Sequence, residues 1–429
     1  MKKILTIIVP ILSALILNSC QKDMVFDLYG DSFKIYYTTV DGRIISLNNA
    51  FSRKIISNTY ENGQGVIITK EAIKEIVESC FHGRIELTSI TIPDSVTSIG
   101  EWAFAGCSSL TSVTIGNGVT WIGKSAFYGC TSLTSVTIGN GVTSIGKSAF
   151  AGCTSLTSIT IPDSVTSIGY DAFYGCESLA SITIPNKVTK ISEGAFYGCI
   201  SLKSVTIPDS VTEIGSMAFG ECFSLTAFYG KLASSDNRCL IANGVLASFA
   251  PKGLTTYTIS DSVTEIGKYA FYCTPLTSVT IPNSVTEIGE CAFYNCASLK
   301  NITIPNSVTE IEMYAFCGCE SLASVTISDR VTTIGEGAFY YCRSLKSVTI
   351  PDSVTSIGEE AFGDCSSLVS VYCKPTIPPT GDSDMFSLCN KGIYTPIGCT
   401  IFVPRNSVED YKSAKYWSEY ASYIVGYDF

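Results

Sequence analysis

The sequence predicts a β-rich solenoid in which each repeat adds one parallel strand and a short helical or 3-10 turn. Two observations predict this fold. A cysteine recurs every 23 residues from Cys107 to Cys222, and again from Cys273 to Cys365. The sequence between the cysteines is nearly the same in each repeat: SLTSVTIGNGVTWIGKSAFYGC at 109–130 is followed by SLTSVTIGNGVTSIGKSAFAGC at 132–153. Stacked repeats bury each other's flat faces, so 429 residues can fold this way without a central core.

Each part of the repeat has its own local signal. Val113 and Ile115 alternate with Ser112 and Thr114, which is the two-residue period of a strand. The IPDSV or IGNGV phrase that follows contains the residues of a turn. The VTSIG phrase then suits a second short extended segment. The last part, KSAFYGC in the repeat at 109–130, fits one helical or 3-10 turn because the repeat phenylalanine and cysteine would share a face.

Departures from the repeat suggest the domain boundaries. A degenerate first copy precedes residue 84, so we count about twelve repeats. We expect a signal peptide at 1–20, a β-rich N-terminal cap at 21–70, a solenoid at 71–373 and a C-terminal cap at 374–429. An insertion at about 228–257 contains RCLIANGVLASF, which predicts a hairpin turning at Asn243-Gly244. This insertion is either a tolerated interruption or a projection that shapes a binding surface.

The first twenty residues indicate export. Two lysines follow Met1, and the mostly apolar run from Ile4 to Leu17 is too short for a comfortable membrane span. The run ends in Leu-Asn-Ser-Cys, which resembles a bacterial lipobox with Cys20 as the lipidated residue. Lys22 and Asp23 resemble signals that send lipoproteins of Gram-negative bacteria to the cell surface. We expect a protein anchored in the outer membrane by this lipid and facing outward.

The nineteen cysteines do not indicate a metal site. Zinc sites need closely spaced Cys or His pairs, and Cys317/Cys319 and Cys291/Cys296 each place one member on the buried row. We therefore expect free, packed thiols. Cys389 and Cys399, in the irregular C-terminal cap, form the pair most suited to a disulfide.

The remaining charged and polar residues do not form an active site. His82 is the sole histidine, and no phosphate-binding glycine motif is present. A formal net charge of −10 argues against nucleic-acid binding. One glutamate precedes the repeat isoleucine in each of four copies, which is typical of a solvated stripe: Glu213, Glu265, Glu287 and Glu310. We expect no catalytic residues, no cofactor and no metal.

Repeated polar and aromatic positions are the candidate ligand-binding residues. Two mainly hydroxyl columns should run along the strands, formed by Ser112, Thr114, Ser135, Thr137, Ser158, Thr160, Ser181, Thr183, Ser204 and Thr206. A broken row of tyrosines follows the repeat phenylalanine and includes Tyr128, Tyr174 and Tyr197. The columns are either a solvated face with good strand propensity or a surface for a protein or glycan. Tyrosines suit interfaces and sugar stacking, but packing between turns explains the row equally well.

The stretch from about residue 76 to 373 resembles the BspA-like class of bacterial leucine-rich repeats, on the phrase IPxSVTxIGxxAFxxC. The flanks are also similar, including YTTVDGRI at 37–44 and a tail in which Val408, Tyr411 and Trp417 have roughly helical spacing. The resemblance implies a right-handed, curved leucine-rich-repeat superhelix with a β-rich N-terminal cap and an α/β C-terminal cap. It also implies a secreted or surface-anchored protein that binds extracellular-matrix proteins or other bacteria.

The leading hypothesis is therefore a non-enzymatic surface adhesin that binds a host or bacterial surface protein, or a glycan. A periplasmic or envelope scaffold for bacterial proteins is a second hypothesis, and a glycan-capture lipoprotein is a third. We expect a monomer that contacts the membrane only through its N-terminal lipid and binds no nucleic acid.

Overall fold

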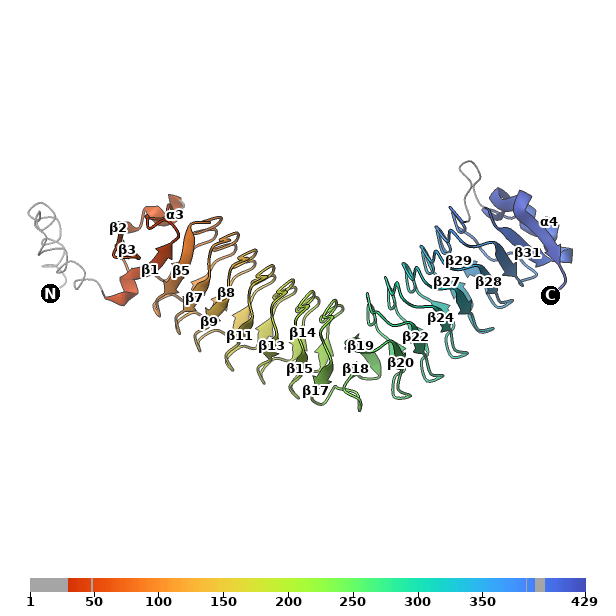
Figure 1. Ribbon diagram of the computed structural model, residues 1–429, viewed down its shortest axis with the longest axis horizontal. Helices are drawn as coiled ribbons and strands as arrows, with labels where there is room; N and C mark the ends of the chain where they lie inside the picture. The colour runs from red at the N-terminus through yellow and green to blue at the C-terminus, as the bar shows by residue number, and fades with distance from the viewer. Residues whose placement is uncertain (1–29, 48, 383, 390–397) are drawn as a thin grey trace, which may run out of the picture.

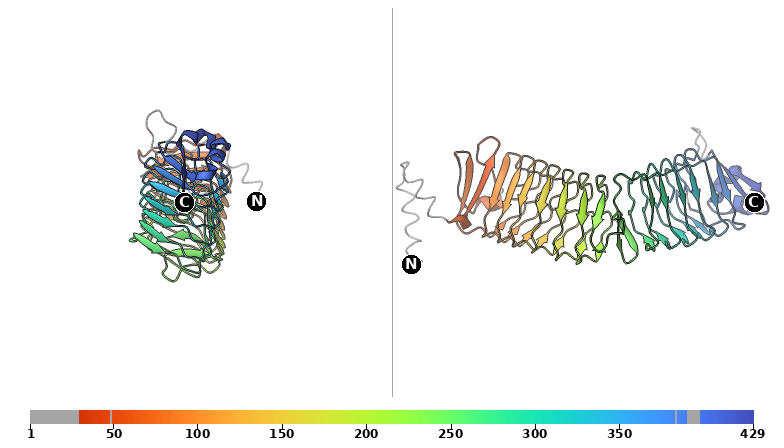
Figure 2. Two further views of the ribbon diagram at one scale, coloured as in Figure 1. Left: turned by 90° about the vertical axis from the view of Figure 1, so that its right-hand side faces the viewer. Right: turned by 60° about the horizontal axis from the view of Figure 1, so that its bottom comes forward.

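The computed structural model describes residues 30–47, 49–382, 384–389 and 398–429. These residues form a long solenoid bent into an arc, with strands β1–β3 at one end and β31 and α4 at the other (Figure 1). Viewed along its length, the repeats superpose in one narrow cross-section (Figure 2). The predicted solenoid is confirmed. The predicted signal peptide, Cys20, Lys22 and Asp23 lie outside the described residues.

The predicted strand of each repeat is present and forms a first sheet along the solenoid. Its pairs are parallel and in the register of the repeat, so Ser112 lies opposite Ser135 and Thr114 opposite Thr137. Hydrogen-bonded pairing is interrupted between β9 and β11, between β17 and β20, and between β26 and β28. The strands are β5 (Leu87–Ile92), β7 (Ser112–Ile115), β9 (Ser135–Thr137), β11 (Ser158–Thr160), β13 (Ser181–Thr183), β15 (Ser204–Thr206), β17 (Ala227–Tyr229), β20 (Thr256–Thr258), β22 (Ser278–Thr280), β24 (Asn301–Thr303), β26 (Ser324–Thr326), β28 (Ser347–Ile350) and β30 (Ser370–Cys373).

The extended segment expected at VTSIG is confirmed as a two-residue strand that builds a second parallel sheet. It buries the repeat isoleucine, as Ile122 and Ile145 show. Pairing in this sheet stops between β12 and β14 and between β16 and β18. The strands are β4 (Glu75–Ile76), β6 (Ser98–Ile99), β8 (Trp121–Ile122), β10 (Ser144–Ile145), β12 (Ser167–Ile168), β14 (Lys190–Ile191), β16 (Glu213–Ile214), β21 (Glu265–Ile266), β23 (Glu287–Ile288), β25 (Glu310–Ile311), β27 (Thr333–Ile334) and β29 (Ser356–Ile357).

The segment from the repeat glycine to the repeat cysteine, which we call the AF segment (residues 100–107 and their equivalents), is neither helical nor 3-10. It is a run of turns in which the N–H groups donate alternately within their own repeat and to the next repeat. The Cys107 N–H donates to the Phe104 carbonyl of its own repeat at 3.2 Å, whereas the Phe104 N–H donates to Ala126 of the next repeat at 2.7 Å. Positive φ angles at Trp102 (56°) and Gly106 (71°) produce this alternation. The AF segment therefore links neighbouring repeats, which a helical turn would not.

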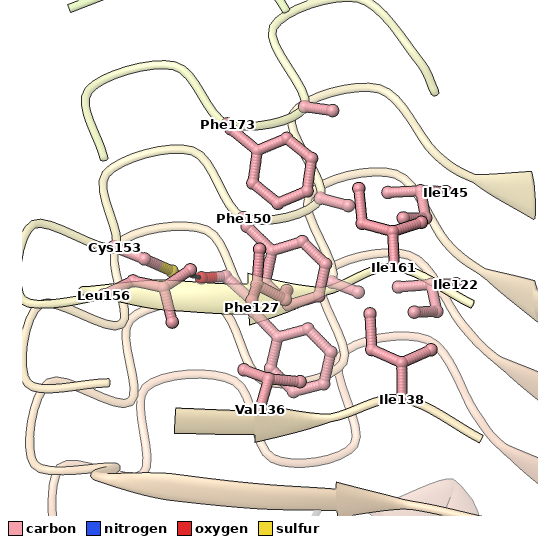
Figure 3. Close-up of a cluster of buried hydrophobic side chains, with 14 of the residues drawn as sticks. Ile122, Phe127, Val136, Ile138, Ile145, Phe150, Cys153, Leu156, Ile161 and Phe173 are labelled. Atoms are coloured by element: carbon pink, nitrogen blue, oxygen red, sulfur yellow. Dashed lines mark hydrogen bonds between the residues drawn. The ribbon is translucent and has the colours of Figure 1, made fainter. Parts of the chain in front are cut away.

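The phenylalanines of successive AF segments stack face to face through the core. From Phe81 to Phe219 the ring centroids are 4.9–5.5 Å apart, with interplanar angles of 1–8°. A second stack runs from Phe271 to Phe386 at 4.9–5.7 Å. Figure 3 shows Phe127, Phe150 and Phe173 in this stack, with isoleucines on one side and Cys153 and Leu156 on the other. The spacing is close to that of paired strands, so the backbone sets it.

The row of cysteines is buried as free thiols, and these thiols also form hydrogen bonds between repeats. Cys130 donates its Sγ hydrogen to the Phe104 carbonyl of the preceding repeat at 3.1 Å, and this bond recurs along the row. Every cysteine in the described residues is free, including Cys389 and Cys399, the pair most suited to a disulfide. Cys389 instead occupies a place on the row, bonded to the Phe362 carbonyl at 2.9 Å.

One repeat places a different residue on this row. Cys273 keeps the 23-residue spacing but lies only partly buried, with φ at 56°. Thr274 takes the buried position and contacts the Cys296 thiol at 3.3 Å. The reason is that this repeat lacks one residue between its phenylalanine and its leucine, Leu276.

Caps close both ends of the solenoid. At the N-terminal end, β1 pairs antiparallel with β5 of the first sheet. At the C-terminal end, β31 and β32 extend that sheet in parallel beyond β30, and Tyr411 and Trp417 are buried. The cap elements are η2 (Asp31–Phe33), β1 (Lys34–Thr39), α3 (Asn49–Ser52), β2 (Ile55–Glu61), β3 (Gln64–Thr69), β31 (Thr400–Pro404), η3 (Arg405–Ser407), α4 (Val408–Ser413), η4 (Trp417–Tyr423) and β32 (Ile424–Tyr427). In the described residues, no helix is both long and apolar enough to span a membrane.

The insertion divides the solenoid into two stacks. It contains the predicted hairpin, β18 (Cys239–Ala242) and β19 (Val245–Phe249), with positive φ at Asn243 and Gly244. Strand β19 pairs in parallel with β21 and so joins the second sheet. The buried residues form two core clusters that separate at this point, which lies at the bend of the arc (Figure 1).

The buried thiols predict a loss of stability at high pH. Burial raises the pKa of Cys176 and of Cys222 from 9.0 to about 12. Unfolded thiols ionise near pH 9 while folded ones stay protonated, so the free energy of unfolding is highest below pH 9 and falls as the pH rises towards 12. Each such thiol contributes a slope of up to about 1.4 kcal/mol per pH unit. Urea denaturation with a reductant at pH 8, 9 and 10 measures this slope. It should be shallower in Cys176→Ala/Cys222→Ala, and a pH-independent midpoint in the native chain would contradict the prediction.

Candidate functional site

The hydroxyl columns lie on the outer side of the first sheet, as predicted. Each candidate serine and threonine alternates with a buried aliphatic residue, as Ser135 and Thr137 flank Val136. All ten side chains from Ser112 to Thr206 are exposed or half-buried. Parallel register aligns them into two columns within β7–β9 and within β11–β15. None of the ten hydroxyls makes a hydrogen bond with another described residue, so their donors and acceptors are open to solvent or a ligand.

A neighbouring threonine column has a structural role that sequence reasoning did not separate from the candidate columns. Thr111 immediately precedes Ser112, and its Oγ1 donates to the Thr88 carbonyl one repeat earlier at 2.9 Å. Thr134 makes the same bond to Thr111 at 3.0 Å. These hydroxyls reinforce the stack, and their hydrogens are not available to a ligand. Their signal in the sequence is only a threonine at the start of the strand, which strand propensity alone explains.

The tyrosine row is not a continuous platform. Tyr128 packs edge-on against Trp102 at 5.7 Å, and Ala151 separates it from Tyr174. Tyr174 and Tyr197 stack on each other at 5.0 Å, with an interplanar angle of 8°. One face of the Tyr174 ring and one face of the Tyr197 ring therefore cover each other, while Tyr128 and Tyr174 remain 47% and 46% exposed. These tyrosines belong to the AF segments, whereas the hydroxyl columns belong to the strands.

Tyr197 also spans the junction between the two stacks. Its ring lies over Gly220, where an added Cβ would be 2.9 Å from the ring, and reaches Tyr272 at 6.1 Å. Burial and hydrogen bonds to Glu221 and Tyr272 raise the pKa of Tyr197. This contact links repeats that the insertion separates in sequence, so the spacing of the repeats did not predict it.

The acidic stripe lies on the second sheet and forms no catalytic pair. Glu265 and Glu287 are register partners on β21 and β23. Burial and then the charge of Glu287 raise the pKa of Glu265. Glu213 instead forms an ion pair with Lys190 at 2.9 Å. Within the described residues, no group of three or more Cys, His, Asp or Glu is placed to hold a metal ion.

A hollow at the junction between the two stacks is a feature that sequence reasoning missed. The open space inside it is about 350 Å³, most of it solvent at the mouth, and the volume that the centre of a water molecule can occupy is about 20 Å³. The AF segment that ends at Cys222 forms one wall, with Met217, Phe219 and Glu221. The next AF segment, at 267–274, forms the opposite wall, and the insertion closes the floor. The loss of the 23-residue period at 222–273 was the available signal for it.

Comparison with known proteins identifies the repeats. The BspA type leucine-rich repeat region matches residues 53–179, 166–238 and 245–369. A search of curated proteins finds no match.

Three solved structures of bacterial repeat proteins are similar to this chain. A leucine-rich cell surface protein of Faecalibacterium prausnitzii is 32% identical over 80% of this chain and 94% of its own, with a TM-score of 0.61. A leucine-rich repeat protein of Bacteroides ovatus is 32% identical over 87% of this chain and 91% of its own, with a TM-score of 0.58. One from Eubacterium ventriosum is 26% identical over 74% of this chain and 88% of its own, also with a TM-score of 0.58. The chain therefore belongs to the BspA-type leucine-rich repeat family.

Proposed function

We propose that this chain is a non-enzymatic binding protein of the cell surface, and that the hydroxyl columns of its first sheet contact a protein ligand. The observation that carries the proposal is the difference between two kinds of hydroxyl. Thr111, Thr134 and Thr226 are bonded to the preceding repeat, whereas none of the ten candidate hydroxyls from Ser112 to Thr206 has a partner in the described residues. The unpartnered hydroxyls form a long, uncharged face of exposed or half-buried side chains.

Such a face suits a protein more than a sugar. A protein ligand supplies backbone and side-chain groups that bond to hydroxyls over many repeats, and charged groups are depleted at the centre of such interfaces. Sugar recognition typically adds the open face of an aromatic ring, and the faces of Tyr174 and Tyr197 are stacked on each other. An extracellular-matrix protein or a protein on another cell is therefore the ligand class that we propose.

The proposed location is the outer face of the outer membrane. The Leu-Asn-Ser-Cys ending at Cys20 supports a lipid anchor, and the similar protein of Faecalibacterium prausnitzii is described as a cell surface protein. A long solenoid tethered at one end would hold its first sheet away from the membrane.

Lysine substitutions on the first sheet test the binding face. We expect the variant Ser135→Lys/Thr137→Lys/Ser158→Lys/Thr160→Lys to lose at least tenfold in affinity for immobilised fibronectin, laminin or collagen, because four charges would be desolvated at the interface. A matched control, Asn140→Lys/Asp163→Lys/Asn186→Lys, adds the same net charge at exposed turns. Surface plasmon resonance measures both. Equal losses in the two variants, or no loss in the first, would refute the proposed face.

Protease treatment of intact cells tests the location. We expect the solenoid to be cleaved while a periplasmic marker survives, because an outward-facing anchor leaves the chain outside the permeability barrier. Immunoblotting with an antibody to the C-terminal cap measures the cleavage. If the chain is protected until the outer membrane is opened, the adhesin proposal fails and an envelope scaffold is the better account.

A further inference from the structure

The ladder of hydrogen bonds between AF segments has one break in the described chain. In the repeat before the break, Gly194, Phe196 and Gly198 donate their N–H groups to the carbonyls of Ser216, Ala218 and Gly220 at 2.9–3.1 Å. The next set of equivalent donors is Met217, Phe219 and Glu221, and none of these three N–H groups has an acceptor. The pattern resumes at Tyr269, Phe271 and Cys273, which donate to Glu290, Ala292 and Tyr294.

The acceptors on the other side of the break are also unused. In a regular stack, the three donors would meet the carbonyls of Lys268, Ala270 and Tyr272, and no donor reaches these carbonyls. Both AF segments line the hollow at the junction. One wall of the hollow therefore carries a row of N–H groups at alternate residues, and the opposite wall carries a row of carbonyls with the same period. Between them, one layer of backbone is missing.

Side chains of the insertion pack against the core on each side of this gap. Phe228 packs against Phe219 at 5.3 Å, and Phe249 of the hairpin packs against Phe271 at 4.9 Å. The backbone of the insertion turns away at Phe249 and Ala250, where the Ala250 N–H donates to Arg238 instead. The insertion therefore adds one ring to each core cluster and leaves the backbone groups of the edge without partners.

The open edge is accessible from outside. Ile214, Met217 and Glu221 are half-buried, whereas the isoleucine equivalent to Ile214 is buried in every other regular repeat. Phe223 at the rim of the hollow is 43% exposed. Unpaired backbone groups beside exposed apolar side chains form the kind of edge that natural sheets normally protect. Here the hairpin covers the floor of the hollow, and the ring of Tyr197, which lies over Gly220 and reaches Tyr272 at 6.1 Å, is the side chain that spans this edge.

We propose that the junction binds a short polypeptide segment of a partner protein, which takes the place of the missing AF segment. Its carbonyls would accept from Met217, Phe219 and Glu221, and its N–H groups would donate to the carbonyls on the opposite wall. A polypeptide fits because its donors and acceptors alternate with the period of both rows, as in strand addition to an open sheet edge. An apolar side chain of the segment would pack against Phe223, and a basic one would face Glu221. The inference rests on the proposed function, since it names how part of a protein ligand is held.

The first test concerns the free protein. Hydrogen–deuterium exchange resolved to single amides should show Met217, Phe219 and Glu221 exchanging at least a hundredfold faster than Gly194, Phe196 and Gly198. The compared amides occupy the same positions in adjacent repeats, so the hydrogen bond is the main difference between them. Equal protection of the two sets would show that the edge is closed, and it would overturn the proposal.

The second test uses dodecapeptides selected from a random phage library on the full chain. Bound peptides should slow exchange at Met217, Phe219 and Glu221. Ala247→Arg, which places a long side chain in the hollow, and Phe223→Lys at the exposed rim should each weaken binding at least tenfold. Tyr170→Lys, at an exposed aromatic residue outside the junction, is the matched control and should bind normally. Unchanged melting temperatures confirm that the variants fold.

The outcomes separate this inference from the proposed function. If selected peptides bind Ala247→Arg and Phe223→Lys as well as the native chain, or if no peptide protects the three amides, the junction site is refuted. Loss of matrix-protein binding in the first-sheet lysine variant would still support the proposed function in that case. If no matrix protein binds the native chain while peptides bind the junction, the proposed ligand class fails and the junction site stands.

Discussion

The hydrogen bonds between successive AF segments are the interaction on which the rest of this structure depends. Pairing in both sheets is interrupted at several repeats, yet the AF ladder continues through those interruptions and breaks only at the insertion within the described chain. Its bonds fix the distance and the register of neighbouring repeats. The stacked phenylalanines and the thiols bonded to their carbonyls follow from that register, because each needs the same residue at the same height in the next repeat.

The same constraint explains why the outside of the molecule repeats. A register fixed inside the coil aligns every outward position into a column, whether or not the column binds anything. The Thr111 column is used to hold repeats together, while the Ser112 and Thr114 columns are left unpartnered. A site that recognises one specific ligand is therefore expected where the sequence departs from the repeat. The insertion is the largest interruption of the repeat, and it leaves backbone groups without partners where the described repeats on either side of it satisfy them.

Much of the fold could be predicted from the sequence because its period records the packing directly. The 23-residue spacing placed Phe127 and Cys130 in the core and Ser112 and Thr114 on the surface. The turn structure of the AF segment could not be predicted, because residues such as Trp102 and Ser125 hold positive φ without the glycine that usually marks it. The spacing also misplaced Cys273, since Thr274 takes the buried position in a repeat one residue shorter. The junction hollow depends on where an irregular hairpin folds back, which no local pattern encodes.

The insertion divides one solenoid into two stacks with separate cores. Native-state hydrogen exchange of Phe316→Ala tests it most directly. Removing this buried ring should cost about 3–5 kcal/mol in the second stack. We predict exchange about a hundredfold or more faster across residues 265–373, with residues 87–214 unchanged, and the mirror result for Phe150→Ala. Equal loss of protection in both stacks from either substitution would contradict the account, because the solenoid would then unfold as one unit.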